Sequence, residues 1–190
     1  MSDRRFTWKA SGITPLVMNS NAVLITGSGK DEVRDKHAWE LEHYRDACYV
    51  QADGRLYIPA RAVKKAYALA AKFTPKKPKG TGFKSFGPLI EAALLVEGDA
   101  LLSRALSDVQ PWTAVVNLDP SKGPRGPRGP RTRPLVPLPW SAETTFMVMD
   151  EQLTEDLLTE LAELSGKRCG LLDARAIDYG RCLITVREIR

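Results

Sequence analysis

Four short segments have the hydrophobic and polar pattern of strands. Residues 5–10 alternate between polar and apolar side chains, which is typical of a strand with one buried face. Residues 112–118 are rich in β-branched and aromatic side chains, which favour strands. Residues 144–149 and 182–187 complete the set. Together they predict an antiparallel sheet.

Two shorter β-prone segments, residues 48–51 and 56–58, lie on either side of Asp53-Gly54. Asp-Gly between two such segments predicts a hairpin with a tight primed turn. Residues 89–96 form an apolar run, and we expect them to enter a buried strand.

Three stretches have apolar residues at helical spacing. Residues 31–48 predict the first helix. Pro59 begins the second helix at its favoured first turn, and the apolar stripe of this helix extends to Phe73. Residues 153–164 combine a leucine stripe with an acidic face, which predicts a strongly amphipathic helix closed by Gly166.

The order of these elements predicts the fold class. Strands and helices that follow one another in this way favour an α+β fold, with helices packed on one face of an antiparallel sheet. The β-α-β unit at residues 146–186 fits a ferredoxin-like core. A chain of 190 residues with 43% hydrophobic residues suits a single domain, residues 1–190.

Residues 123–133, GPRGPRGPRTR, interrupt this pattern. Glycine and proline oppose both a helix and a central strand, so we expect an exposed arm at residues 120–140, between two strands. No acidic residue occurs between Asp119 and Glu143, and nothing local neutralises the cations of the arm. These cations are Lys122, Arg125, Arg128, Arg131 and Arg133. The arm therefore predicts an anionic partner, with nucleic acid as the first candidate.

A second basic region covers residues 56–90, where no Asp or Glu occurs. Its predicted nucleic-acid contacts are Lys64, Lys65, Lys72, Lys76, Lys77, Lys79 and Lys84. Phe83 and Phe86 alternate with lysine and glycine and are predicted to stack on bases, because every base has a π-face. The alternative is that both rings dock their loop on the core.

Other chemistry is weakly indicated. His37, Glu40 and His43 recur every three residues, so a metal site on a helix has to be considered, but a solvated or partly packed helix face is the default explanation. Residues 26–30 imitate the end of a phosphate-binding loop without its first glycine, which favours a flexible loop. We therefore expect no cofactor, no metal and no catalytic set.

The cellular setting follows from two further features. The three cysteines form no CxxC pair, which favours buried thiols in a reducing compartment. Met1 and Ser2 are followed by the charged residues Asp3, Arg4 and Arg5, and no apolar run approaches the roughly 20 residues of a membrane helix. We expect a soluble protein of the cytoplasm.

The last third of the chain carries a resemblance to known families. Residues 170–175 (GLLDAR) and 179–182 (YGRC), after an acidic leucine helix, resemble the tail of small phage-type proteins of unassigned function. Residues 12–19 and 57–59 are similar to the same proteins. The glycine-bracketed turn before a final Tyr-Gly-Arg strand is also similar to RAMP proteins, the ferredoxin-like RNA-binding subunits of CRISPR effector complexes.

The resemblance to RAMP proteins implies a function. It implies that a non-catalytic, often oligomeric subunit binds the backbone of a single strand, and it nominates Arg175 and Arg181. The turn of RAMP proteins is usually richer in glycine, and Leu172 and Ala174 stand here where glycine is expected.

The sequence favours two functional hypotheses. The first is a non-catalytic protein of phage or mobile-element origin that binds single-stranded RNA or DNA and forms a homo-oligomer or joins a larger complex. The alternative is a protein-interaction module, for assembly or against host defence, whose arm clasps an acidic partner or the acidic helix of a neighbouring subunit. An enzyme is a third possibility, in which His37 or His43 would serve a nuclease.

Overall fold

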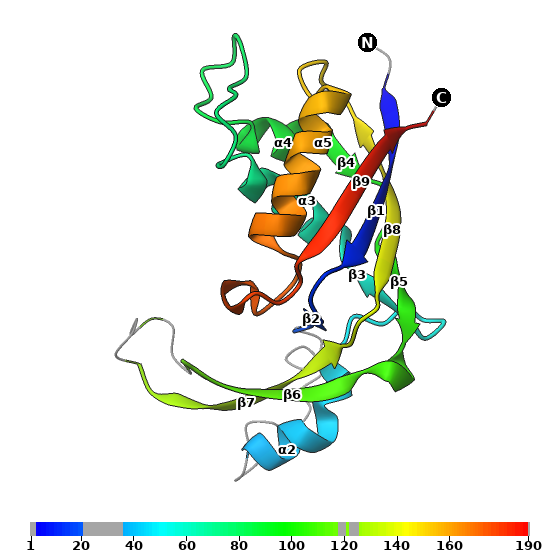
Figure 1. The fold of residues 1–190 in the computed structure, drawn as a ribbon, viewed down its shortest axis with the longest axis vertical. Coiled ribbons are helices and arrows are strands. Elements are labelled where there is room, and N and C mark those ends of the chain that lie inside the picture. Colours follow the sequence, from blue (N-terminus) through cyan, green and yellow to red (C-terminus); the bar gives the residue numbers. More distant parts are fainter. Residues whose placement is uncertain (1–2, 21–35, 118–120, 122–125, 190) are drawn as a thin grey trace.

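The fold is built on two antiparallel sheets (Figure 1). The computed structural model describes residues 3–20, 36–117, 121 and 126–189. The larger sheet has six strands, in the order β3-β5-β8-β1-β9, and β4 also pairs with β8. These strands are β1 (Arg4–Gly12), β3 (Arg55–Ile58), β4 (Leu94–Val96), β5 (Ala100–Ala105), β8 (Ser141–Val148) and β9 (Cys182–Glu188).

The strand order confirms the ferredoxin-like core. Strand β1 lies between β8 and β9 and is antiparallel to both, so β8 and β9 are parallel to each other. Helix α5 (Glu155–Leu164) connects them and completes the predicted β-α-β unit. Thr154 caps α5, because its hydroxyl accepts a hydrogen bond from the Leu157 N–H.

Helices cover one face of the large sheet, as the sequence predicts. Helices α3 (Ala60–Ala70), α4 (Gly87–Ala93) and α5 all lie on this face (Figure 1). Inward-facing residues of the strands meet them in one core, where Phe6 stacks on Phe146 and Tyr67 of α3 meets the Phe146 ring edge-on. The alternate residues of β1, such as Lys9, face away from this core.

The smaller sheet contains β2 (Leu16–Val17), β7 (Arg128–Val136) and β6 (Gln110–Asn117), in that order. Strands β6 and β7 form a long curved ribbon that projects beyond the large sheet (Figure 1). Helix α2 (Lys36–His43) packs against β7. Trp140, at the start of β8, joins the two sheets, because its indole N–H donates to the carbonyl of Thr14 over 2.8 Å.

The structure corrects the prediction of an exposed arm. Residues 128–133 belong to β7 and pair with β6 along its length. Strand β2 pairs only with residues 135 and 136, so among the described strands β7 has a free edge at Pro130. Proline is tolerated at such an edge, because its missing N–H is not needed for a hydrogen bond to a second strand. The predicted flanking strand at 144–149 lies in the large sheet instead, as β8.

Several element boundaries also differ from the prediction. Residues 87–93 form α4 before the short β4, since Pro88 stands at a helix start, where proline is favoured. Helix α5 continues past Gly166 through a π-helical turn (Ser165–Cys169) and stops at Gly170, which has a φ of 69°. In the hairpin, Gly54 has a φ of 85° but Asp53 is not left-handed, so the loop is not the primed turn predicted.

Residues 26–30, which imitate a phosphate-binding loop, lie outside the described residues, as do residues 31–35 of the predicted first helix. In the part of the chain that the structure describes, no helix combines the length and the hydrophobicity that crossing a membrane would require.

Candidate nucleic-acid interface

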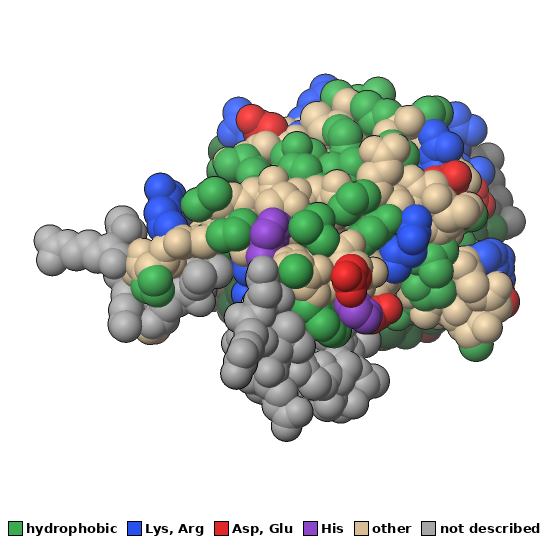
Figure 2. Space-filling model, turned by 90° about the horizontal axis from the view of Figure 1, so that it is seen from below, with side chains coloured by type: hydrophobic (Ala, Val, Ile, Leu, Met, Phe, Trp, Pro, Cys, Tyr) green, Lys and Arg blue, Asp and Glu red, His purple; other side chains and the backbone are tan. Residues whose placement is uncertain are grey.

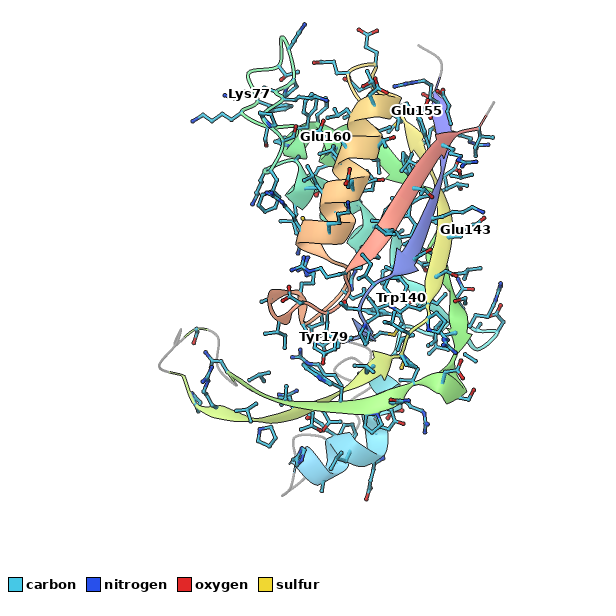
Figure 3. All side chains as sticks on the ribbon, in the orientation of Figure 1. Lys77, Trp140, Glu143, Glu155, Glu160 and Tyr179 are labelled. Atoms are coloured by element: carbon cyan, nitrogen blue, oxygen red, sulfur yellow. The ribbon has the colours of Figure 1, made fainter. Side chains whose placement is uncertain are left out.

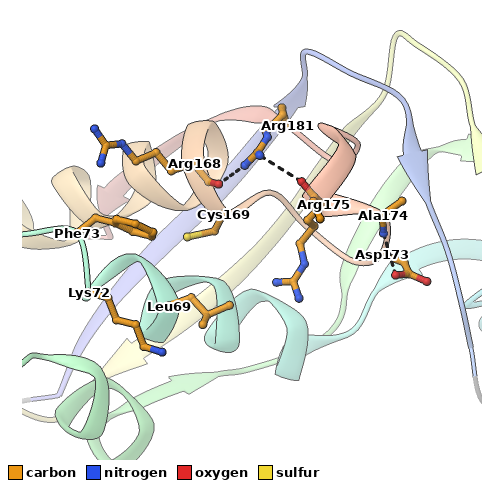
Figure 4. Close-up of a pocket in the computed structure, with 10 residues that line it drawn as sticks. Leu69, Lys72, Phe73, Arg168, Cys169, Asp173, Ala174, Arg175 and Arg181 are labelled. Atoms are coloured by element: carbon orange, nitrogen blue, oxygen red, sulfur yellow. Dashed lines mark hydrogen bonds between the residues drawn. The ribbon is translucent and has the colours of Figure 1, made fainter. Parts of the chain in front are cut away.

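A groove of about 620 Å³ opens between the end of α3, the π-helical turn and the turn that leads into β9 (Figure 4). Its lining residues are Leu69, Lys72, Phe73, Arg168, Cys169, Asp173, Ala174, Arg175, Ala176 and Arg181. A smaller cavity of about 190 Å³ shares Asp173 and Arg175 with it and extends to Lys65 and Tyr49.

Two helix ends supply one side of the groove. Pro75 pushes the residue before it out of helical conformation, so α3 cannot continue. Its last turn tightens, with the N–H of Phe73 donating to the carbonyl of Ala70 over 2.9 Å. The π-helical turn carries Arg168 and Cys169 to the same place, against α3.

Residues 170–180 form the other side, and their backbone is left-handed at five positions. Gly170 and Gly180 have positive φ, and so do Leu172, Ala174 and Asp178, with φ of 57°, 55° and 66°. Positive φ in residues other than glycine costs energy and concentrates at functional sites. Leu172 and Ala174, where the resemblance expects glycine, therefore keep the backbone that glycine favours.

Hydrogen bonds to the segment between β1 and β2 hold this turn in place. The Gly180 N–H donates to the Pro15 carbonyl over 2.9 Å, and the Arg181 N–H donates to the Thr14 hydroxyl over 2.9 Å. Tyr179 contacts Trp112 of β6, with ring centroids 5.0 Å apart, so the turn also rests on the ribbon (Figure 3).

The two nominated arginines differ in what their guanidinium groups contact. Arg181 donates to the carbonyl of Arg168, to the carbonyl of Arg175 over 3.2 Å and to the carboxylate of Asp178 over 3.0 Å. The side chain of Arg181 therefore fixes the shape of the turn. Arg175 lines both cavities, and its guanidinium has no hydrogen bond or ion pair to any described residue.

The groove carries an excess of positive charge. Among the residues that the structure describes, Lys72, Arg168 and Arg175 have no carboxylate partner. Asp173 is the one carboxylate in the lining, and it is paired with Arg133 of β7. An anion that enters this groove meets three cations that no described carboxylate neutralises.

Cys169 does not provide a nucleophile for the groove. Burial raises the pKa of its thiol, and the neighbouring charges of Arg175 and Arg181 offset this only partly. The thiol is therefore neutral at physiological pH, whereas the thiolate is the nucleophilic form.

The histidines lie elsewhere. Both come to the face seen from below, with α2, and neither lines the groove (Figure 2). His43 stacks on Trp39, with ring centroids 4.4 Å apart. Glu40 lies between the two histidines in the sequence and is buried. Its carboxylate forms an ion pair with Arg131 and accepts a hydrogen bond from the N–H of Thr132. No group of three or more metal-ligating side chains is arranged to hold an ion in the described residues.

Most of the basic region at residues 56–90 lies away from the groove. The loop that carries Lys77 is at the opposite end of the molecule from the β6–β7 ribbon (Figure 3). Lys76 forms an ion pair with Glu160 over 2.5 Å, which lowers the pKa of that carboxyl together with a hydrogen bond from Thr74. Lys64 lines neither cavity, and the exposed residues Lys77, Lys79 and Lys84 also lie outside both. Lys72 and Lys65 are the members that the structure brings to the two cavities.

The two phenylalanines of this region have different environments. Phe86 is 5% exposed and belongs to the core, so the prediction that it stacks on a base is wrong and the docking alternative holds for it. Phe83 is 41% exposed and lies outside the groove.

The cations of the predicted arm are partly neutralised, contrary to expectation. The Nε of Arg131 is 2.7 Å from a carboxylate oxygen of Glu40, and Arg133 pairs with Asp173. Both acids are distant in the sequence, which is why the local charge pattern concealed them. Arg128 is exposed, and Lys122 and Arg125 lie outside the described residues.

Sequence reasoning missed two residues of the groove, Phe73 and Arg168. The helical period assigned Phe73 to the core, but it is 50% exposed. Pro75, two residues after Phe73, was the available signal that the helix would end before the last residue of its apolar stripe. Arg168 had no signal, because it depends on the π-helical turn.

Comparison with known proteins confirms the fold. No protein-family model and no curated protein matches the sequence. A chain from the cryo-EM structure of the Type III-B Cmr-beta bound to cognate target RNA is similar over 99% of this chain, with a TM-score of 0.61 and 13% identity. This protein spans 61% of the length of that chain. Cmr6 from Pyrococcus furiosus is similar over 96% of this chain and 99% of its own, with 16% identity and a TM-score of 0.47. The predicted resemblance to RAMP subunits therefore holds at the level of the fold.

Proposed function

We propose that this protein binds single-stranded RNA in the groove beside residues 170–181, as a non-catalytic subunit of a larger complex. The observation that carries the proposal is the set of three cations, Lys72, Arg168 and Arg175, that line one groove without a described carboxylate partner. Phosphates are the natural ligands of such a set, because arginine and lysine neutralise the backbone of a nucleic acid without reading its sequence.

The similar Cmr-beta structure supports RNA as the ligand and a complex as the setting. That structure was determined bound to its cognate target RNA. A groove beside a single turn also suits a single strand, whose backbone is flexible enough to follow a short curved path.

A binding role without chemistry accounts for the contents of the groove. The Cys169 thiol is held neutral by burial, and no histidine lines the groove. A nuclease would need a general base within hydrogen-bond reach of the ribose or of a water molecule.

The ribbon supplies a second contact in this proposal. Arg131 and Arg133 are engaged by Glu40 and Asp173, so Arg128 is the arm cation in the described part of the chain that is left for a partner. The homo-oligomer, the phage origin and the cytoplasmic location stay predictions from the sequence.

The experiment compares three variants for binding of a labelled 20-nucleotide RNA. The groove variant is Lys72→Ser, Arg168→Ser, Arg175→Ser. The matched control, Lys9→Ser, Arg55→Ser, Arg187→Ser, removes the same formal charge from exposed sites outside the groove. The third is the ribbon variant Arg125→Ser, Arg128→Ser.

We expect the groove variant to bind at least about 10-fold more weakly in 0.1 M salt and the control to change affinity about 3-fold or less. Undetectable binding by the native protein at low salt would reject the proposal. If only the ribbon variant lost affinity, the groove would not be the site. Binding to an acidic protein without binding to RNA would establish the interaction module.

A further inference from the structure

Phe73 lines the groove with a partly exposed aromatic ring, which leaves the ring accessible to a ligand. Its ring is half exposed, although it continues the apolar stripe of α3 that buries Val63, Tyr67 and Ala70. The tightened turn after Ala70 rotates the residue away from the core and into the lining of the groove. Phe73 therefore departs from the buried apolar stripe of α3 and lines a charged groove instead. Such departures from the local sequence pattern are expected at functional sites.

Arg168 fixes one face of this ring. Its guanidinium carbon lies 5.5 Å from the centroid of the Phe73 ring, in the geometry of a cation–π contact. The backbone of Arg168 is anchored, because its carbonyl accepts a hydrogen bond from Arg181. One face of the ring therefore contacts the Arg168 guanidinium, while Phe73 stays half exposed.

The surroundings of the pair specify the chemistry of the ligand. Phe73 and Arg168 stand at one end of the groove, and Arg175 stands at the other (Figure 4). Lys72 lies beside Phe73 on the same helix end. A ligand that matches this arrangement has a flat apolar face next to negative charge, which describes a nucleobase joined to its phosphate.

We propose that Phe73 and Arg168 form a stacking platform for one base of the bound strand. This inference rests on the proposed function and adds a base contact to the phosphate contacts of the groove. Stacking is available to every base, so the platform takes any base and increases affinity without selecting a sequence.

The test compares a 20-nucleotide RNA with a fully abasic strand of the same length, which offers no base in any binding register. Each RNA is measured with the native protein and with Phe73→Leu, which keeps an apolar side chain but removes the ring. Phe73→Tyr keeps the ring. Leu95→Ala is the control, because Leu95 is a similarly exposed apolar residue that lies outside the groove.

We expect the native protein and Phe73→Tyr to bind the abasic strand about 5- to 150-fold more weakly than the intact RNA, which is the range for loss of one stacked base. Phe73→Leu should bind intact RNA correspondingly more weakly and should no longer distinguish intact from abasic RNA. Leu95→Ala should behave like the native protein.

The outcomes separate this inference from the proposed function. If the native protein binds RNA but Phe73→Leu leaves both the affinity and the abasic difference unchanged, the platform is wrong and the groove proposal stands. If Phe73→Leu lowers only the midpoint of thermal unfolding, the contact with Arg168 is structural and the platform is again wrong. If no RNA binds at all, both proposals fail.

Discussion

The arginines of residues 123–133, two of them described members of the repeated Gly-Pro-Arg triplet, have different roles in this molecule. Arg128 is exposed near the start of β7, whereas Arg131 reaches the buried carboxylate of Glu40 and Arg133 pairs with Asp173 in the turn. The two paired residues hold α2 and the turn against the ribbon. Repetition in the sequence therefore does not imply a shared function.

Removal of Arg131 should affect stability more than RNA affinity. In Arg131→Ala the buried carboxylate of Glu40 loses the guanidinium of Arg131, and removing one partner of a buried ion pair is costly. Because the Arg131 side chain is partly exposed, we expect a loss of about 1 to 3 kcal/mol in the free energy of unfolding, measured with urea. Arg128→Ala is the control, with an expected change below about 0.5 kcal/mol. Equal losses in the two variants would contradict this role of Arg131.

Two buried thiols make the stability depend on pH in the alkaline range. Burial raises the pKa of Cys48 and of Cys182 from 9.0 to about 12. Between these values the unfolded chain has released protons that the folded chain keeps, so a rise in pH favours unfolding.

Each thiol should contribute a fall of about 1.4 kcal/mol per pH unit in the free energy of unfolding above pH 9. Urea unfolding at pH 8, 9 and 10 measures this fall. The variant Cys48→Ala, Cys182→Ala should be less stable than the native protein at pH 8 and should show a shallower decline. If the free energy of unfolding fell equally with pH in the native protein and in the variant, the two thiols would not have the raised pKa that their burial implies.

At the scale of elements, the sequence specified strands better than helix ends. The alternation of polar and apolar residues along β1 shows directly which of its faces is buried. Strands β1, β6, β8 and β9 all lie close to the residues where the sequence predicts strands. The end of α5 depends instead on a contact between Gly166 and β9, which no local pattern contains. The arm was misjudged for a similar reason, since pairing with β6 outweighs the local preferences of glycine and proline.

The candidate groove was predictable only in part. Arg175 and Lys72 were found, from the resemblance and from local charge, and Arg181 was found but stabilises the turn through its own side chain. Phe73 was assigned to the core because a helical period cannot show where the helix stops. A site made where two helix ends meet a turn depends on tertiary packing, which the sequence expresses only indirectly.

The π-helical turn should not tolerate a side chain at Gly166. A Cβ there would lie 2.1 Å from the carbonyl oxygen of Cys182, so Gly166→Ala must push the turn away from β9. We expect a loss of about 1 to 3 kcal/mol in the free energy of unfolding, as for other overpacked sites. Gly98→Ala is the control, because a Cβ at Gly98 meets no atom within 4 Å. Thermal unfolding of both variants tests this contact, and an equal effect would contradict it.

At the scale of the molecule, the basic features considered above lie in three places within the described part of the chain. The lysine loop lies at one end, the β6–β7 ribbon lies at the other, and the groove lies between them (Figures 1 and 3). Lys76 is neutralised in the loop, and Arg131 and Arg133 are neutralised in the ribbon. A cavity, cations without a described carboxylate partner and an exposed aromatic ring coincide in the groove, and we therefore propose that the RNA binds there.

The most direct measurement is the salt dependence of RNA affinity for the native protein and for the variant Lys72→Ser, Arg168→Ser, Arg175→Ser. Each phosphate contact on a single strand adds about 0.7 to the slope of log K against log salt. Loss of three contacts should therefore make the variant's slope shallower by about 2. Parallel lines for the two proteins would contradict the account, because the groove cations would then contact no phosphate.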